Sequence, residues 1–152
     1  MEAKYYTPEI EEFHIGFEYE QKYIVQQSES VIIEWRKRLI EKVREIPLVE
    51  FIMKDPKMDG SQIRTKYLDA SDIEELGFTF TGKSIDIWFK KNVSETPGGR
   101  NKLTHVTLHY NLQDHELKID CYFGEEHEGC LFEGFIKNKS ELKVLLKQLN
   151  TL

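Results

Sequence analysis

The spacing of hydrophobic residues predicts a mixture of strands and helices. Residues 12–20 alternate between apolar and polar side chains, which is the period-2 pattern of a strand with one solvated face. From Ser30 to Ile46 the apolar residues instead recur at steps of three and four. This pattern predicts an amphipathic helix over 30–46 that ends before Pro47, because the residue preceding a proline disfavours helical geometry.

The middle of the chain reads mainly as strands joined by turns. Residues 48–53 and 63–68 are β-rich runs separated by a segment with Asp-Pro and Asp-Gly pairs, so a hairpin is expected. Residues 69–76 closing on Gly77 predict a short capped helix. Further strands are predicted at 78–81, 84–91, 103–111, 116–123 and 130–136.

The C-terminus predicts the clearest helix. Asn138 and Glu141 have the spacing of an N-cap and its N3 partner, and leucines follow on one face. Strands lying between helices at either end predict an α+β fold in a single domain, 1–152. We expect an antiparallel sheet of about six to eight strands packed by the C-terminal helix, with earlier helices around 30–46 and 70–76.

Composition agrees with a folded protein. The chain has 152 residues, of which 39% are hydrophobic and 32% charged, far from the composition of disordered chains. Its longest apolar run, residues 46–49, is much shorter than the ~20 residues that cross a bilayer. The first residues lack the pattern of a signal peptide. We therefore expect a cytoplasmic protein with no membrane partner.

The charge distribution weighs against nucleic acid. The net charge is −6, from 21 basic and 27 acidic side chains. Non-specific DNA binding depends on many basic groups that displace counterions. Direct nucleic-acid binding is therefore not expected.

Cysteine and histidine residues are the first candidates for catalysis. Cys121 or Cys130 could act as a thiolate, with His127 or His109 as base and Asp120 as the orienting group. However, Cys121 is in phase with the apolar face of its predicted strand, where a thiol packs as a small hydrophobe. Both cysteines are expected to be free thiols. No catalytic residue is assigned, and an enzyme stays an alternative.

The histidines do not predict a metal site. His105 and His109 share one face of a predicted strand, but four residues of strand separate them by ~13 Å. Such histidines most simply lie on the solvated face of a sheet. No metal or cofactor is expected.

A glycine-containing loop at 94–102 is the candidate for ligand binding. Glycines let backbone N–H groups approach an anion, and a nearby tryptophan could stack a base. The simpler interpretation is a polar hairpin loop with tryptophans anchored in the core. The residues predicted to hold a phosphate-containing small molecule are Gly98, Gly99, Arg100 and Lys102, with Trp88 and Trp35 as stacking surfaces.

Three segments carry a resemblance to a group of proteins. They are the opening YYTPEIEEFHIGFEYE, residues 5–20; the stretch 63–78, with KYLD and DIEELGF; and 136–149, with IKNKSELK and LKQL. Together they resemble small accessory proteins, without an assigned activity, that phages and prophages of gut bacteria carry. This resemblance implies a protein of a mobile element.

The resemblance, with the lack of a coherent catalytic motif, sets the functional expectation. Accessory proteins of this kind commonly act by binding. We expect a non-enzymatic protein that binds a host protein in the host cytoplasm, for example to inhibit a defence system. The alternatives are a phosphate- or nucleotide-binding module, a Cys/His-dependent enzyme, and a minor virion protein.

Overall fold

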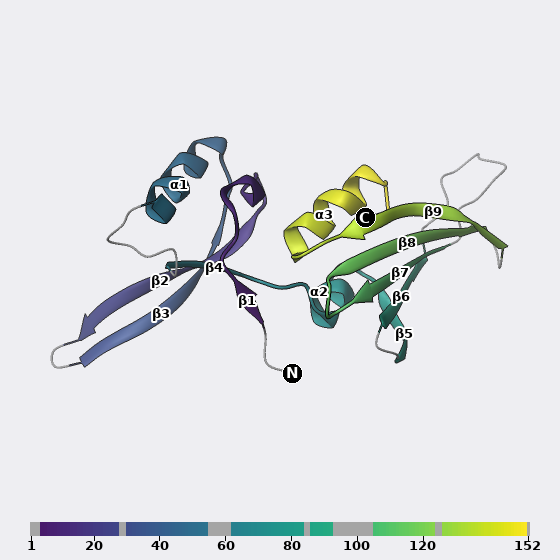
Figure 1. The fold of residues 1–152 in the computed structure, drawn as a ribbon, viewed down its shortest axis with the longest axis horizontal. Helices are drawn as coiled ribbons and strands as arrows, with labels where there is room; N and C mark the ends of the chain where they lie inside the picture. Colours follow the sequence, from purple (N-terminus) through teal and green to yellow (C-terminus); the bar gives the residue numbers. More distant parts are fainter. Residues whose placement is uncertain are drawn as a thin grey trace. The chain divides into compact units, whose positions relative to one another are not determined.

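A computed structural model describes residues 4–27, 30–54, 62–83, 86–92, 105–123 and 126–151. The chain divides into two compact units, Met1–Tyr67 (unit 1) and Leu68–Leu152 (unit 2), which are described separately (Figure 1). The predicted α+β class is confirmed, with antiparallel sheets and a C-terminal helix. The single domain stays a prediction. No helix among the described residues is long and apolar enough to span a membrane.

The described residues of unit 1 form a four-stranded antiparallel sheet in the order β1-β4-β2-β3, with one α-helix. Its small core contains Phe13, Phe17, Ile40, Val49 and Ile63. The elements are β1 (Tyr5–Tyr6), the 3₁₀ helix η1 (Ile10–Glu12), β2 (Glu18–Gln27), β3 (Ser30–Leu39), the 3₁₀ helix η2 (Val43–Glu45), α1 (Ile46–Lys54) and β4 (Ile63–Lys66).

The predicted helix over 30–46 is wrong. Residues 30–39 form β3, which pairs with β2 over ten consecutive positions. The β-branched run of Val31, Ile32 and Ile33 favours a strand, and pairing with β2 supplies backbone hydrogen bonds along one edge of that strand. The helical spacing of the apolar residues was therefore accidental.

The strand predicted at 48–53 is also wrong, because these residues lie in α1. Pro47 stands in the first turn of this helix. Proline is tolerated there, since the first N–H groups have no partner within the helix. It marks the start of one helix, where the sequence predicted the end of another. The strand at 63–68 is confirmed over Ile63–Lys66, and the turn at 55–60 lies outside the described residues.

The strand predicted at 12–20 begins only at Glu18. Phe13 and Phe17 are buried, but Ile15 between them is 56% exposed. Gly16 has a φ of +90°, a left-handed conformation that glycine adopts readily. The chain turns here, so the apolar alternation does not describe one strand face.

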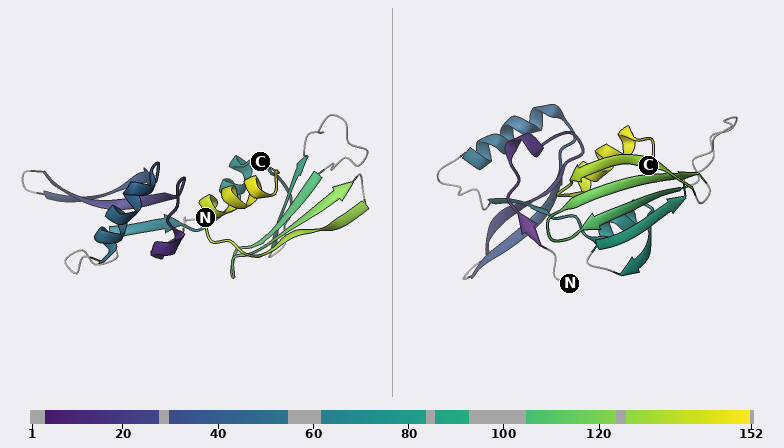
Figure 2. Two further views of the ribbon diagram at one scale, coloured as in Figure 1. Left: turned by 90° about the horizontal axis from the view of Figure 1, so that it is seen from above. Right: turned by 45° about the vertical axis from the view of Figure 1, so that its right-hand side comes forward.

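Unit 2 follows the prediction closely. Its five strands pair in sequence order, β5-β6-β7-β8-β9, and buried residues of the sheet pack with those of the two helices in one core. Both helices lie on one side of the sheet (Figure 2); we call the opposite side the outer face. The elements are α2 (Ala70–Glu75), β5 (Thr79–Lys83), β6 (Asp86–Asn92), β7 (His105–Asn111), β8 (Glu116–Phe123), β9 (Glu126–Phe135) and α3 (Lys139–Gln148).

Both predicted helix caps in unit 2 are confirmed. The Asp69 side chain accepts a hydrogen bond from the Asp72 backbone N–H, 3.1 Å away, and Gly77 follows α2 with a φ of +86°. At α3, the Asn138 side chain accepts from the Glu141 N–H at 3.0 Å. These caps satisfy N–H groups that the helices themselves leave unpaired.

Candidate functional site

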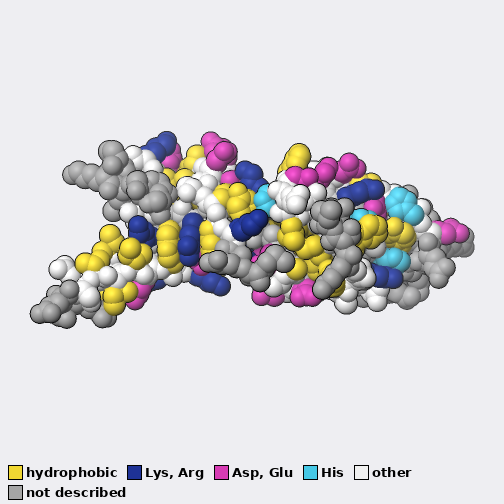
Figure 3. All heavy atoms as spheres, turned by 60° about the horizontal axis from the view of Figure 1, so that its bottom comes forward, with side chains coloured by type: hydrophobic (Ala, Val, Ile, Leu, Met, Phe, Trp, Pro, Cys, Tyr) yellow, Lys and Arg dark blue, Asp and Glu magenta, His cyan; other side chains and the backbone are white. Residues whose placement is uncertain are grey.

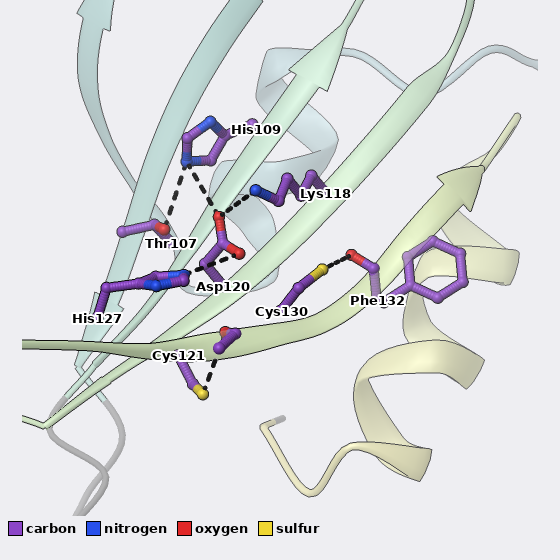
Figure 4. A network of polar contacts seen from close by, with 9 residues as sticks. Thr107, His109, Lys118, Asp120, Cys121, His127, Cys130 and Phe132 are labelled. Carbon is purple, nitrogen blue, oxygen red and sulfur yellow. Dashed lines mark hydrogen bonds and ion pairs between the residues drawn. The ribbon is translucent and has the colours of Figure 1, made fainter.

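The predicted bases His109 and His127 and the predicted orienting group Asp120 lie on the outer face of the sheet in unit 2. Thr107 lies opposite Asp120 across β7 and β8, and Asp120 lies opposite Cys130 across β8 and β9. Hydrogen bonds and ion pairs connect the side chains around these positions (Figure 4). We call the connected set the Asp120 cluster; it consists of Thr107, His109, Lys118, Asp120 and His127.

The Asp120 carboxylate is buried, with only 3% of the residue exposed. Its Oδ1 lies 3.3 Å from His127 Nε2, and its Oδ2 lies 3.4 Å from Lys118 Nζ. The carboxylate raises the pKa of Lys118 by attraction and hydrogen bonding. These contacts compensate for the removal of the carboxylate from water.

The geometry around His109 is not that of a catalytic triad. Its Nε2 lies 3.4 Å from Thr107 Oγ1 and 3.9 Å from Asp120 Oδ2. A triad needs the hydroxyl and the carboxylate on opposite nitrogens of the ring, so that one side takes the proton while the other orients the imidazole. Here both groups face the same nitrogen.

The cysteines do not complete a nucleophilic pair. Cys130 is exposed, and its thiol donates to the Phe132 carbonyl at 3.2 Å. Figure 4 shows its sulfur pointing toward Phe132 and away from the His127 ring. Cys121 is buried, as predicted, and both thiols are free. The structure therefore places the predicted bases, His109 and His127, beside the predicted orienting group, Asp120. It does not place a cysteine thiol with them as the nucleophile.

His105 and His109 lie on the outer face beside aromatic rings. The His105 ring stacks on Tyr122 with 4.7 Å between ring centroids, and His109 packs against Trp88 at 3.8 Å. Burial and the positive charge of Lys90 lower the pKa of His105. In the part of the chain that the structure describes, no three His, Cys, Asp or Glu residues are placed to hold a metal ion.

The two tryptophans predicted as stacking surfaces have different surroundings. Trp88 in unit 2 is 46% exposed. Trp35 in unit 1 is covered by the Arg64 guanidinium, 3.9 Å from the ring centroid. Trp88 is therefore the better surface for a planar ligand. Gly98, Gly99, Arg100 and Lys102 lie outside the described residues.

Unit 1 exposes an apolar hairpin that sequence analysis missed. β4 pairs with β2 only at Glu20 and Gln21, so residues 22–27 and 30–35 of the hairpin form a ribbon of just two described strands. We call this segment the apolar ribbon (Figure 3). Its exposed aliphatic side chains are Ile24 and Val31, each 65% exposed, Ile33, 56% exposed, and Ile32, 39% exposed.

Basic residues of β3 follow the apolar ribbon in sequence. The Arg36 guanidinium lies 2.8 Å from the Glu34 carboxylate and 4.7 Å from the Tyr23 ring centroid, and Arg38 donates to the Tyr23 hydroxyl. A pocket of about 460 Å³ adjoins these residues, with lining residues that include Tyr19, Arg38 and Ile52.

The sequence pattern did not predict this ribbon, because the spacing of apolar residues in 30–46 favours an amphipathic helix. The consecutive β-branched residues 31–33 were the one available signal for a strand. No signal showed that their side chains would remain exposed, since exposure depends on which elements cover the hairpin.

These observations define the class of protein as α+β, with two antiparallel sheets, an exposed apolar hairpin and a polar cluster that forms neither a catalytic triad nor a Cys–His pair. The chain matches no family model, no curated protein and no solved structure.

Proposed function

We propose that the protein acts by binding another protein, without turning over a substrate, and that the apolar ribbon is the binding surface. The exposed aliphatic cluster around Ile24 and Ile33 is the observation that carries this proposal. An isolated two-stranded hairpin is marginally stable in water, and contiguous exposed apolar surface marks interaction sites. A partner that covers the ribbon would remove this surface from water.

The proposed partner is a host protein in the host cytoplasm, for example a component of a defence system. This part rests on the resemblance to phage and prophage accessory proteins. The acidic composition, with a net charge of −6, favours a protein over nucleic acid as the partner.

We expect the double variant Ile24→Thr/Ile33→Thr to lose its partner while it stays folded. The two residues lie opposite each other on one face of the ribbon, and threonine keeps the β-branched shape that suits a strand. Removing the apolar side chains should weaken binding about tenfold or more, the effect of losing ~1.4 kcal/mol. The measurement is affinity purification from host lysate, with the captured proteins quantified by mass spectrometry.

The control is Val43→Thr/Leu48→Thr, which changes two similarly exposed apolar residues outside the hairpin. A host protein captured by the wild type and the control, but not by the ribbon variant, supports the proposal. Equal capture by all three proteins, or no capture by the wild type, contradicts it.

Binding of a phosphate-containing small molecule is the second candidate, and the exposure of Trp88 favours it. Its half-exposed ring lies beside His109 on the outer face, and Lys90 follows on the same strand. Aromatic stacking with a nearby cation is a common mode of nucleotide binding. Arg100 and Lys102 stay in the proposed site as predicted from the sequence.

If this candidate is right, ATP or GTP should raise the melting temperature of the wild type, but not of Trp88→Ala or Arg100→Ala/Lys102→Ala. Phe135→Ala, at an exposed aromatic residue of β9, is the control and should keep the stabilisation. Differential scanning fluorimetry measures the shift, since a ligand that binds only the native state raises its stability. A nucleotide effect that survives in Trp88→Ala removes this candidate.

A further inference from the structure

The edge of β3 that faces away from β2 is long and regular. β3 is the last strand of its sheet, and within the described residues only β2 pairs with it. Its ladder with β2 runs from Ser30 to Leu39 without a register shift, and the strand contains no proline or glycine. A long regular edge of this kind presents a row of backbone donors and acceptors to another strand.

The other described edge strands are protected in ways that β3 is not. β1 has only two residues. β5 is interrupted by a bulge between Phe80 and Gly82. β9 is as long as β3, but its ladder with β8 shifts register twice. Short edges and bulges are devices by which proteins prevent edge pairing, and their absence distinguishes β3.

One antiparallel register pairs β3 with a second copy of itself so that the charges nearest the centre are complementary. If Trp35 lies opposite its own copy across a two-fold axis perpendicular to the sheet, Glu34 lies opposite Arg36 of the second chain, and Arg36 opposite Glu34. Further from the centre, Ile33 and Ile32 lie opposite Lys37 and Arg38, whose aliphatic stems can pack against them. Val31 lies opposite Leu39, and both are exposed in this chain. Opposite charges and apolar pairs directly across two strands are stabilising.

The two neighbouring symmetric registers place like charges at their centre, although centring on Arg36 also sets Glu34 opposite Arg38. Centring the pair on Glu34 places two carboxylates opposite each other, and centring it on Arg36 places two guanidinium groups together. Like charges directly opposite are destabilising. In the monomer, Glu34 and Arg36 bind each other at 2.8 Å and both side chains are about half exposed, so they are accessible to exchange partners.

We infer that β3 pairs with β3 of a second copy of this chain, antiparallel and centred on Trp35. The pairing joins the two four-stranded sheets of unit 1 into one continuous sheet with a closed two-fold interface. The second copy would pair with the edge of β3, whereas the proposed host partner would bind the faces of the apolar ribbon. The two apolar ribbons would then lie in one sheet, and a host partner is not required for the pairing.

Exchanging charges in β3 tests this inference on the purified full chain. Glu34→Arg places arginine opposite arginine, and Arg36→Glu places glutamate opposite glutamate. Each variant alone should dimerise at least about tenfold more weakly than the wild type. An equimolar mixture of the two variants should restore the dimer, because every 34–36 pair across the interface again has opposite charges.

Sedimentation velocity over a concentration series measures the association. Arg44→Glu, which makes the same charge change at an exposed residue outside the hairpin, should dimerise like the wild type. A monomeric wild type, unaffected single variants, or single variants that stay monomeric after mixing would each overturn the inference. None of these results depends on capture of a host protein, so the inference and the proposed function can fail separately.

Discussion

Replacing Phe17 with alanine is expected to destabilise unit 1 by about 3–5 kcal/mol, the usual cost of removing a buried aromatic ring. Phe17 is completely buried, and its ring packs against Phe13 with 4.8 Å between centroids. The core of unit 1 contains few buried residues. Little other apolar surface is available to compensate for the cavity.

Ile15→Ala is the matched control, because Ile15 lies two residues away but is more than half exposed. Its effect should be within about 0.5 kcal/mol of zero. Urea unfolding can be followed by the fluorescence of Trp35 in a Trp88→Phe background, since Trp35 is then the only tryptophan and lies in unit 1. Similar losses of stability in the two variants would contradict the assignment of Phe17 to the core.

Leu142→Ala is expected to destabilise unit 2 by about 2–5 kcal/mol. Leu142 is completely buried on α3, in the same core as residues of the five-stranded sheet. Alanine keeps the helix propensity, so the loss measures packing and not helix formation. The free energy of unfolding can be obtained from Trp88 fluorescence in a Trp35→Phe background, with far-UV circular dichroism as a second probe.

Val144→Ala, on the exposed side of the same helix, should change the free energy of unfolding by less than about 1 kcal/mol. If Val144→Ala costs as much as Leu142→Ala, the helix does not pack on the sheet through the face described here.

The sequence predicted unit 2 well and unit 1 poorly, for a physical reason. In unit 2 the local signals agree with each other: caps at Asp69 and Asn138, a left-handed Gly77, and alternating strands such as β7, whose inward residues are buried. In unit 1 the signals conflict. The spacing of apolar residues in 30–46 favours a helix, whereas the β-branched residues 31–33 favour a strand, and pairing with β2 decides the outcome.

The candidate sites show the same limit. The sequence supplied the residue types of the Asp120 cluster, but only the register of β7, β8 and β9 shows that His109 and His127 meet at Asp120 while the Cys130 thiol points elsewhere. The apolar ribbon could not be predicted, because hydrophobic residues in a sequence are normally expected to be buried.

The order of the strands also has a consequence for how quickly each unit folds. In the unit 2 sheet every strand pairs with its neighbour in sequence, so its contacts have a short separation along the chain. In unit 1, β1 pairs with β4, which joins Tyr5 to Lys66. Folding slows as the average sequence separation of contacts increases. We therefore expect the five-stranded sheet of unit 2 to form early. The sheet of unit 1 should be completed only after β1 and β4, which are far apart in the sequence, have come together.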